Sequence, residues 1–329
     1  MRNLGKLAVL GITALGLALA GPQDNSLVIG ASQEPRVLAG DFLSVISNQA
    51  IKSEIEQYLF APFIGFNADS QNFPVLATEV PTLENGRLRV TDIGGGKKRL
   101  EMDITIRPDA KWSDGRPITT EDVAFYFEVG KAKGMPVLNP DFWERVNVRI
   151  KDARNFTLIF EPAYYYDTYG PINTYAPKHI MGPEWERVKA AARGLDPQKD
   201  AEKLNELYRN FFIKFSTPQA LNRGAMVYSG PFMLRRWVPG NSIEMVRNPN
   251  FPIKPEGGES KYVQKVVYRF IQNTNSLLVA VIGGSIDATS SVSLTFDQGR
   301  SPQLVRRAPG RFDIWFVPGA IWEHIDINK

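Results

Sequence analysis

The sequence predicts an α/β protein of more than one lobe, for three reasons. Segments in which apolar residues alternate, such as "RLEMDITIR" (99–107), are interspersed with segments of helical periodicity along the chain. The 329 residues exceed the length at which one hydrophobic core usually stops growing. A hydrophobic content of 43% and a charged content of 22% are typical of globular proteins. Because strands and helices are mixed throughout, we expect interwoven lobes instead of separate domains in series.

The first twenty residues have the pattern of a secretory signal peptide. Arg2 and Lys6 precede an uncharged apolar run from Leu7 to Ala20, which ends in Ala-Leu-Ala. We therefore expect cleavage after Ala20 and a periplasmic or extracellular location. The run is shorter than the ~20 residues that a membrane-spanning helix needs.

Charge and cysteine content exclude several classes of partner. The 39 basic and 35 acidic residues give a formal charge of +4, and the basic residues are scattered, so no nucleic-acid binding is expected. The sequence has no Cys, hence no lipid-modified Cys that would tether the protein to a membrane. Only two histidines, His179 and His324, are present. They offer almost no ligand set for zinc, and we expect no metal and no cofactor.

The first half of the chain predicts several strands and a helix before Pro62, in addition to the helix that follows Thr119. An apolar strand starts at Ser26, and a helix places Ile51 and Ile55 on one face before Pro62 stops it. Residues 87–106 read as two strands around the turn "GGGKK", and residues 143–163 as a hairpin around "KDARN".

The second half predicts two helices, a hairpin, a strand and a further helix. The two helices fall within 183–215, where Gly194 ends the first and Asp196-Pro197 begins the second. Strands on either side of Pro239-Gly240-Asn241 follow, and the last helix ends at Gly283-Gly284.

The stretch "KWSDGRPITTEDVAFYF" (111–127) concentrates acidic residues that resemble a catalytic cluster. Asp114 and Gly115 fit a tight turn, because glycine adopts a positive φ without strain. Thr119 and Asp122 have the spacing of a helix capping box, and Glu121 lies in the same first turn. We therefore interpret these acids as turn and cap residues.

Other motifs for chemistry are incomplete. "GGGKK" lacks the spacing and the hydroxyl residue of a phosphate-binding loop. "GGSID" (283–287) has Asp287 in place of the final glycine of a nucleophile elbow. A pair of carboxylates across a cleft has no local signature, so a secreted hydrolase stays open as an alternative. In "EPAYYYDTYGPINTY" (161–175), we expect some tyrosines to face a cleft, since Tyr combines a large ring with one polar tip.

From about residue 26 onward, a set of segments follows a recognisable order: "LVIG", "YLFAPFIGFN", "PVLATEV", "ITIRPDAKWSDGRPITTEDVAFYFE", "RIKDARNFTLIFEPA", "APKHIMG", "YSGPFMLRRWVPGNSIEMVRNPNF" and "LLVAVIGGSID". With these segments the chain resembles the extracellular solute-binding proteins of the oligopeptide and dipeptide type, solute-binding family 5, the receptors of ABC importers. The chain departs from the family pattern at Tyr228-Ser229-Gly230-Pro231, where Gly-Thr-Gly-Pro is usual.

The resemblance implies a periplasmic-binding-protein-like fold of type II, in the large cluster with an extra subdomain and interwoven lobes. After a signal peptide in 1–20, it places the first lobe in 21–70 and 168–285 and an inserted subdomain in 71–167. Residues 286–329 would begin the second lobe. The chain stops near "WEHIDINK", where the family continues, so we expect a truncated chain whose second lobe is largely missing.

The function that the resemblance implies is capture of a peptide or similar solute and its delivery to the transmembrane permease subunits of an ABC transporter. No enzymatic activity is expected, and the protein would act as a monomer. A non-functional fragment of a split receptor is a further alternative. By position in the family pattern, the ligand contacts of the first lobe would come from Ser47, Asn48, Gln49, Phe142, Trp143, Tyr165, Tyr166 and Tyr228.

Overall fold

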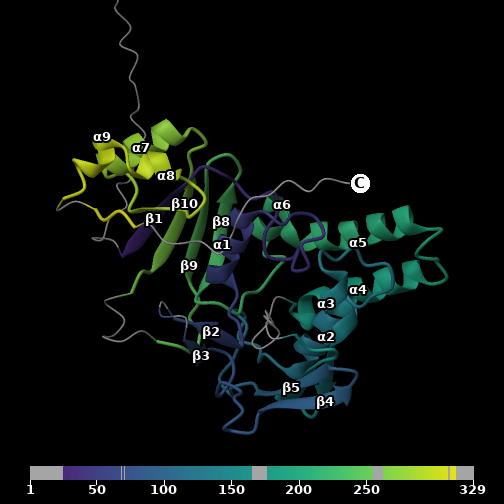
Figure 1. The fold of residues 1–329 in the computed structure, drawn as a ribbon. Coiled ribbons are helices and arrows are strands. Elements are labelled where there is room, and N and C mark those ends of the chain that lie inside the picture. The colour runs from purple at the N-terminus through teal and green to yellow at the C-terminus, as the bar shows by residue number, and fades with distance from the viewer. Residues whose placement is uncertain are drawn as a thin grey trace, which may run out of the picture.

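The computed structural model describes residues 25–67, 69, 71–164, 176–254, 262–309 and 312–315. It confirms a mixed α/β architecture, in which two sheets lie at opposite ends of the molecule with helices between and beside them (Figure 1). Residues 1–20, expected as the signal peptide, lie outside the described residues.

A five-stranded sheet has the order β11-β1-β10-β9-β8. β1 runs parallel to β10 and β11, whereas β9 is antiparallel to both β10 and β8. The register pairs Ile29 with Tyr268 and with Ala288, so β1 is an interior strand. The strands are β1 (Ser26–Ala31), β8 (Phe232–Val238), β9 (Ser242–Arg247), β10 (Lys265–Phe270) and β11 (Ala288–Thr289).

Helices cover both faces of this sheet because β1 alternates between them. Ile29 and Ala31 join the main core with α1 (Ala50–Leu59), while Val28 packs with Leu277 of α7 (Thr274–Gly283). A Cβ on Gly30 would lie 2.5 Å from Leu277 Cδ1, so α7 lies close against the strand. Strand β1 is therefore buried on both sides, as its apolar run predicts.

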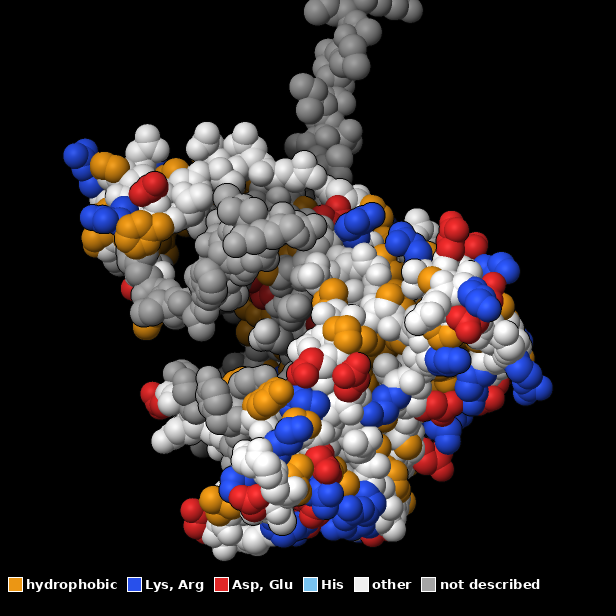
Figure 2. Space-filling model, turned by 45° about the vertical axis from the view of Figure 1, so that its right-hand side comes forward, with side chains coloured by type: hydrophobic (Ala, Val, Ile, Leu, Met, Phe, Trp, Pro, Cys, Tyr) orange, Lys and Arg blue, Asp and Glu red, His pale blue; other side chains and the backbone are white. Residues whose placement is uncertain are grey.

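A four-stranded antiparallel sheet has the order β4-β5-β7-β6. Its inner face carries Leu100, Met102 and Ile104 of β5 opposite Phe160, Leu158 and Phe156 of β7, all buried. Its outer face is charged, and Lys, Arg, Asp and Glu side chains are interspersed over this end of the molecule (Figure 2). The strands are β4 (Leu88–Gly94), β5 (Lys97–Thr105), β6 (Val146–Ile150) and β7 (Asn155–Phe160).

The remaining helices join the two sheets through one continuous core. α2 contacts both α4 and β6, and α5 contacts α4 and α6. Phe42, in the segment before α1, packs against Tyr126 of α2 and Phe212 of α5 at 5.4 Å between ring centres. These helices are α2 (Thr120–Gly130), α3 (Pro140–Arg145), α4 (Lys178–Ala192), α5 (Ala201–Ser216) and α6 (Pro218–Asn222).

Short elements complete the described chain. β2 (Ile64–Phe66) and β3 (Asn72–Pro74) form a two-stranded ribbon. α8 (Phe296–Gly299) and α9 (Pro302–Val305) follow β11 and lie near α7 at one end of the five-stranded sheet (Figure 1). The lobe and subdomain boundaries expected from the sequence stay a prediction.

Two helix starts differ from the prediction. α4 begins at Lys178, so Pro183 lies inside the helix instead of at its start. α5 begins at Ala201 with Asp200 at the N-cap position, not at Asp196-Pro197. Asp196 Oδ1 instead accepts the backbone N–H groups of Gln198 and Lys199 at 2.9 and 3.1 Å, which forms a separate turn before the helix.

The capping box predicted in "KWSDGRPITTEDV" is confirmed. Thr119 caps α2, its side chain and that of Asp122 each accept the other residue's backbone N–H, and Gly115 has φ +87°. The three glycines of "GGGKK" also have positive φ, between +60° and +86°. Glycine is thus required there by the turn between β4 and β5, which accounts for the motif without a phosphate.

Candidate functional site

The carboxyl ends of the three parallel strands meet at one edge of the five-stranded sheet. Ile271 N–H donates to Ala31 O at 2.7 Å, and Ser290 N–H donates to Gly30 O at 2.9 Å, which brings the following segments together. We call these segments, residues 32–49, 271–273 and 290–293, the carboxyl edge. In open α/β sheets, ligands bind outside the carboxyl ends of the strands, so the carboxyl edge is the candidate site.

The segment before α1 is held by its own hydrogen bonds. The Asp41 carboxylate accepts the backbone N–H groups of Val45, Ile46 and Ser47 at 2.8–3.2 Å, which fixes the turn. Gln49 Oε1 accepts from Ser47 Oγ at 2.9 Å and from the backbone N–H of Arg36 at 2.8 Å. These bonds position residues 47–49 at the start of α1.

Of these three predicted site residues, Asn48 has the most exposed side chain. Ser47 is buried, Gln49 is half-buried, and Asn48 is exposed. An amide offers two donors and one acceptor oxygen, the groups that bind a peptide backbone. Asn48 can therefore contact a ligand directly, while Ser47 and Gln49 hold the backbone that carries it.

Glu34 links the carboxyl edge to the β8–β9 hairpin. Its two carboxylate oxygens accept from Trp237 Nε1 at 2.7 Å and from the backbone N–H of Gly240 at 2.8 Å. Trp237 is 1% exposed, so this contact also satisfies a buried donor. Sequence reasoning missed Glu34, because no local pattern connects it with a turn about 200 residues further along the chain.

A buried ionic cluster lies beneath residues 47–49. Lys52 Nζ is 3.3 Å from Glu56 Oε2 and donates to the backbone oxygen of Asp41 at 2.9 Å. Burial raises the pKa of Glu56 to about 7, and burial also raises the pKa of Asp41. One ammonium faces two carboxyl groups here, so the protonation of Glu56 affects the charge balance of the core under the site.

Phe142 and Trp143 lie on α3. Trp143 is 9% exposed and packs against Tyr126 of α2 at 5.4 Å between ring centres. A Cβ on Gly130 would lie 2.2 Å from the Trp143 ring, which shows how closely α2 and α3 approach. Phe142 is half-buried beside Trp143. In this structure the two rings pack in the core instead of lining an open surface, and their contact with a ligand stays a prediction.

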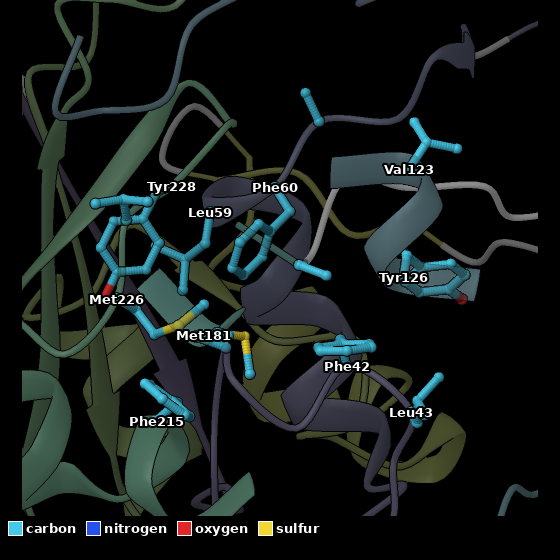
Figure 3. Packing of buried hydrophobic residues seen from close by; sticks show 14 of the residues in the cluster. Phe42, Leu43, Leu59, Phe60, Val123, Tyr126, Met181, Phe215, Met226 and Tyr228 are labelled. Atoms are coloured by element: carbon cyan, nitrogen blue, oxygen red, sulfur yellow. The ribbon is translucent and has the colours of Figure 1, made fainter. Parts of the chain in front are cut away.

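Tyr228 is also buried, at 4% exposure. It lies among Leu59, Phe60 and Met226 (Figure 3), with the Phe60 ring centre at 5.8 Å. Its backbone N–H and oxygen bond to Ser113 of the "SDG" turn at 3.0 and 2.8 Å, which ties that turn to the main core. Tyr228 thus fills space between elements here, and a role in ligand contact stays a prediction. Tyr165 and Tyr166 lie outside the described residues.

The acids of 109–122 have structural partners. Asp109 bonds to Arg107, Asp114 to His179 Nε2 at 2.9 Å, and Glu121 to Lys178. In "GGSID", Asp287 Oδ2 accepts the backbone N–H of Val28 at 2.8 Å. Among the described residues, no group of three His, Asp or Glu side chains could hold a metal ion.

Two cavities open elsewhere on the described surface. One of about 680 Å³ lies where the end of α1 and the β2–β3 ribbon meet the inner face of the four-stranded sheet, with Phe60, Phe63, Met102 and Leu158 in its walls. The other, of about 530 Å³, lies between α2 and α4 and is lined by polar residues that include His179. Neither is lined by the carboxyl edge.

None of the helices in the described ranges combines the length and apolarity needed to cross a bilayer.

Comparison with known proteins places these features in a family. Residues 97–317 match the model of the bacterial extracellular solute-binding proteins, family 5 (middle). The oligopeptide-binding protein AppA of Bacillus subtilis is 23% identical over 270 residues, which cover 80% of this chain and 40% of that protein. A probable ABC transporter-binding protein of Deinococcus radiodurans is 27% identical over 203 residues, or 59% of this chain and 30% of the relative.

A crystal structure of an oligopeptide-binding protein from Thermus thermophilus, complexed with a pentapeptide, is similar to the chain at 97% identity and a TM-score of 0.91. The match covers 94% of this chain and 51% of that one. The chain therefore spans about half the length of this solved relative, and less than half of the two curated relatives.

Proposed function

Because the chain belongs to the bacterial extracellular solute-binding proteins of family 5, we propose that it is the substrate-binding component of an ABC importer. It captures peptides or similar solutes outside the cytoplasmic membrane and delivers them to the permease subunits. The observation that carries this proposal is the 97% identity with an oligopeptide-binding protein whose structure contains a pentapeptide. The chain spans 51% of that protein, so the activity of the whole receptor is part of the proposal.

We further propose that the peptide binds at the carboxyl edge and that Asn48 contributes a direct contact. Support comes from the exposed amide of Asn48 and from the bonds that fix residues 47–49. Phe142, Trp143, Tyr165, Tyr166 and Tyr228 remain predicted contacts. The two cavities are less suitable sites for an extended peptide backbone, because their walls are either mainly apolar or distant from the parallel strands.

The protein acts without bond-making chemistry in this proposal. Asp109, Asp114 and Glu121 pair with neighbouring basic side chains, and Asp122 caps α2. A secreted hydrolase would need a carboxylate pair that faces substrate. Export, cleavage after Ala20 and a monomeric state also belong to the proposal, and rest on the apolar run that ends in Ala-Leu-Ala.

A peptide titration tests the proposal. Pentapeptides of mixed sequence are added to the protein, and the thermal midpoint is followed with peptide concentration. Binding to the folded state raises the midpoint in a saturable way, since a ligand at ~100 times its Kd adds ~2.7 kcal/mol. Mass spectrometry then checks that the peptide is recovered intact. Absence of any stabilisation contradicts the receptor function, and cleaved peptide indicates the hydrolase instead.

Matched variants locate the site. Asn48→Ala should weaken peptide binding by roughly tenfold, because it removes about one to two hydrogen bonds. Asn210→Ala, on the exposed side of α5, is the control and should bind as the wild type does. Equal affinity of both variants places the peptide away from Asn48.

A further inference from the structure

The carboxylate of Glu54 on α1 accepts hydrogen bonds from β10 and from the residues that follow β11. Glu54 Oε1 accepts from Tyr268 Oη of β10 at 2.8 Å. Glu54 Oε2 accepts from Ser290 Oγ at 2.9 Å, Ser291 Oγ at 2.6 Å and the backbone N–H of Ser291 at 3.1 Å. Four hydrogen bonds thus end on one side chain, three of them from the residues that directly follow β11.

All four donors to Glu54 are uncharged groups. The structure shows no ion pair of Glu54 with a Lys or Arg within the described ranges. Burial raises the pKa of Tyr268, so its hydroxyl remains a donor. Hydrogen bonds to a charged group are about twice as strong as those between neutral groups. The carboxylate is therefore a strong and directional attachment point for residues 290 and 291.

Residues 290–293 are the point at which the chain leaves the five-stranded sheet. After β11, Ser290 N–H still bonds to Gly30 O, and Ser293 Oγ donates to the same oxygen at 3.2 Å. Ser32 Oγ donates to Val292 O at 3.1 Å. Beyond Ser293 the chain continues into α8 and α9 at one end of the sheet (Figure 1). α8 is also held by a hydrogen bond from Gln298 Nε2 to Thr274 Oγ1 at the start of α7, at 2.7 Å. The direction of the exit and this bond together bear on where α8 and α9 lie.

β11 by itself is a weak attachment. It contributes two residue pairs with β1, Ile29 with Ala288 and Gly30 with Thr289, and it lies at the edge of the sheet. So short a strand can twist about its single neighbour. The hydrogen bonds to Glu54 join residues 290 and 291 to α1, which is a separate element from β1, and they oppose that rotation.

We propose that Glu54 is a positioning residue. It fixes the direction in which the chain leaves the five-stranded sheet, and so helps to set where α8 and α9 lie relative to that sheet. The functional consequence rests on the proposed function: both sides of the carboxyl edge, residues 32–49 and 290–293, are held in one arrangement for the peptide. Glu54 does not need to touch the ligand for this role.

Spin labels measure the placement directly, because the chain has no Cys of its own. Spin labels are attached at Glu206→Cys on α5 and at Gln303→Cys on α9, which are both exposed positions. The distance between the two labels reports where α9 lies relative to α5. Double electron–electron resonance is recorded on the full chain without peptide. Glu54→Ala removes all four bonds, and Glu54→Gln keeps acceptor oxygen but loses the charge. Ser53→Ala, at the exposed neighbouring position on α1, is the control.

We expect a broader or shifted distance distribution in Glu54→Ala, a smaller change in Glu54→Gln, and the wild-type distribution in Ser53→Ala. Amide exchange of residues 288–293 should accelerate on the order of tenfold in Glu54→Ala, since bonds to a charged group are lost. A wild-type distribution in Glu54→Ala overturns the proposal. If Glu54→Ala does not fold, Ser291→Ala removes one donor on an exposed residue, and an unchanged distribution there overturns it equally.

Peptide affinity separates this inference from the proposed function. If the wild type binds no peptide, the receptor proposal fails, while the distances still test the role of Glu54. If the wild type binds peptide, Glu54→Ala should weaken binding by about tenfold, and Glu54→Gln should restore part of it.

Discussion

The stability of the molecule should depend strongly on Asp122, whose carboxylate joins three segments. Oδ2 accepts the backbone N–H of Thr119 at 3.0 Å and Trp112 Nε1 at 3.3 Å, and Oδ1 accepts the backbone N–H of Lys178 at 2.9 Å. Asp122 is 6% exposed and Trp112 is fully buried. Asp122→Ala therefore leaves the buried indole N–H of Trp112 and the partly buried backbone N–H groups of Thr119 and Lys178 without this acceptor.

The expected loss follows from these donors. A buried donor without a partner costs about 1–3 kcal/mol. With three donors affected, two of them backbone groups that water can partly reach, Asp122→Ala should lower the free energy of unfolding by about 3–6 kcal/mol. Asp122→Asn retains one acceptor oxygen and should lose roughly half as much. In Trp112→Phe the indole donor is absent, so the same Asp122→Ala change should cost about 1–2 kcal/mol less.

Equilibrium unfolding in urea, followed by Trp fluorescence, measures these differences as shifts of the midpoint at constant slope. Glu121→Ala is the matched control, because Glu121 lies in the same helical turn but is exposed and pairs with the half-exposed Lys178 side chain at 3.0 Å. It should cost no more than ~1 kcal/mol. If Asp122→Ala destabilises the protein no more than Glu121→Ala does, the reasoning about the buried donors is wrong.

Three further changes have clear expected outcomes. Burial raises the pKa of Glu56 from 4.5 to about 7, so the stability that the protonated side chain contributes is present below pH 4.5 and lost as the pH rises through 7. In urea unfolding between about pH 5 and 8, the free energy of unfolding of Glu56→Gln should therefore rise by roughly 3 kcal/mol relative to wild type. Parallel plots of this free energy against pH for the two proteins would contradict the expectation. Gly230→Ala should lower the free energy of unfolding by about 1–3 kcal/mol, because the new Cβ would lie 2.6 Å from the backbone of Leu59. A urea midpoint equal to that of the wild type would show that the backbone can move to make room. Gly284 ends α7 at φ +70°, so Gly284→Ala should lower the thermal midpoint at a cost of about 1 kcal/mol. Gly283 has open space around it, so Gly283→Ala should raise the midpoint slightly. Shifts of the same sign in both variants would refute the left-handed cap at Gly284.

The local elements could be predicted from the sequence because their signals lie within a few residues. The capping box at Thr119 and Asp122, the positive φ of Gly115 and the alternation along β5 all appear where the pattern placed them. The start of α5 could not be placed in this way. Asp196-Pro197 fits a helix start by local pattern, but Asp196 forms a separate turn and the helix begins after Asp200.

The candidate site was predictable only in part. Residues 47–49 precede a helix at the carboxyl edge, which is consistent with the expected contact, and Asn48 is exposed there. Tyr228 and Trp143 are expected at the ligand by their position in the family pattern; both are buried in this structure, and their contact with a ligand stays a prediction. Whether a tyrosine is buried or open depends on what packs over it, and its own neighbours in sequence do not specify this.

The sequence by itself determined the α/β class, the turns and caps, and the family, because these depend on short-range backbone preferences and on the order of motifs along the chain. Only the tertiary structure decided how the carboxyl edge is held. Glu34 meets Gly240, and Glu54 meets Ser290 and Ser291, across more than 200 residues in each case. The residues around a Glu in the sequence do not indicate which distant donor its carboxylate will contact, because that pairing forms only when the strands of the sheet assemble.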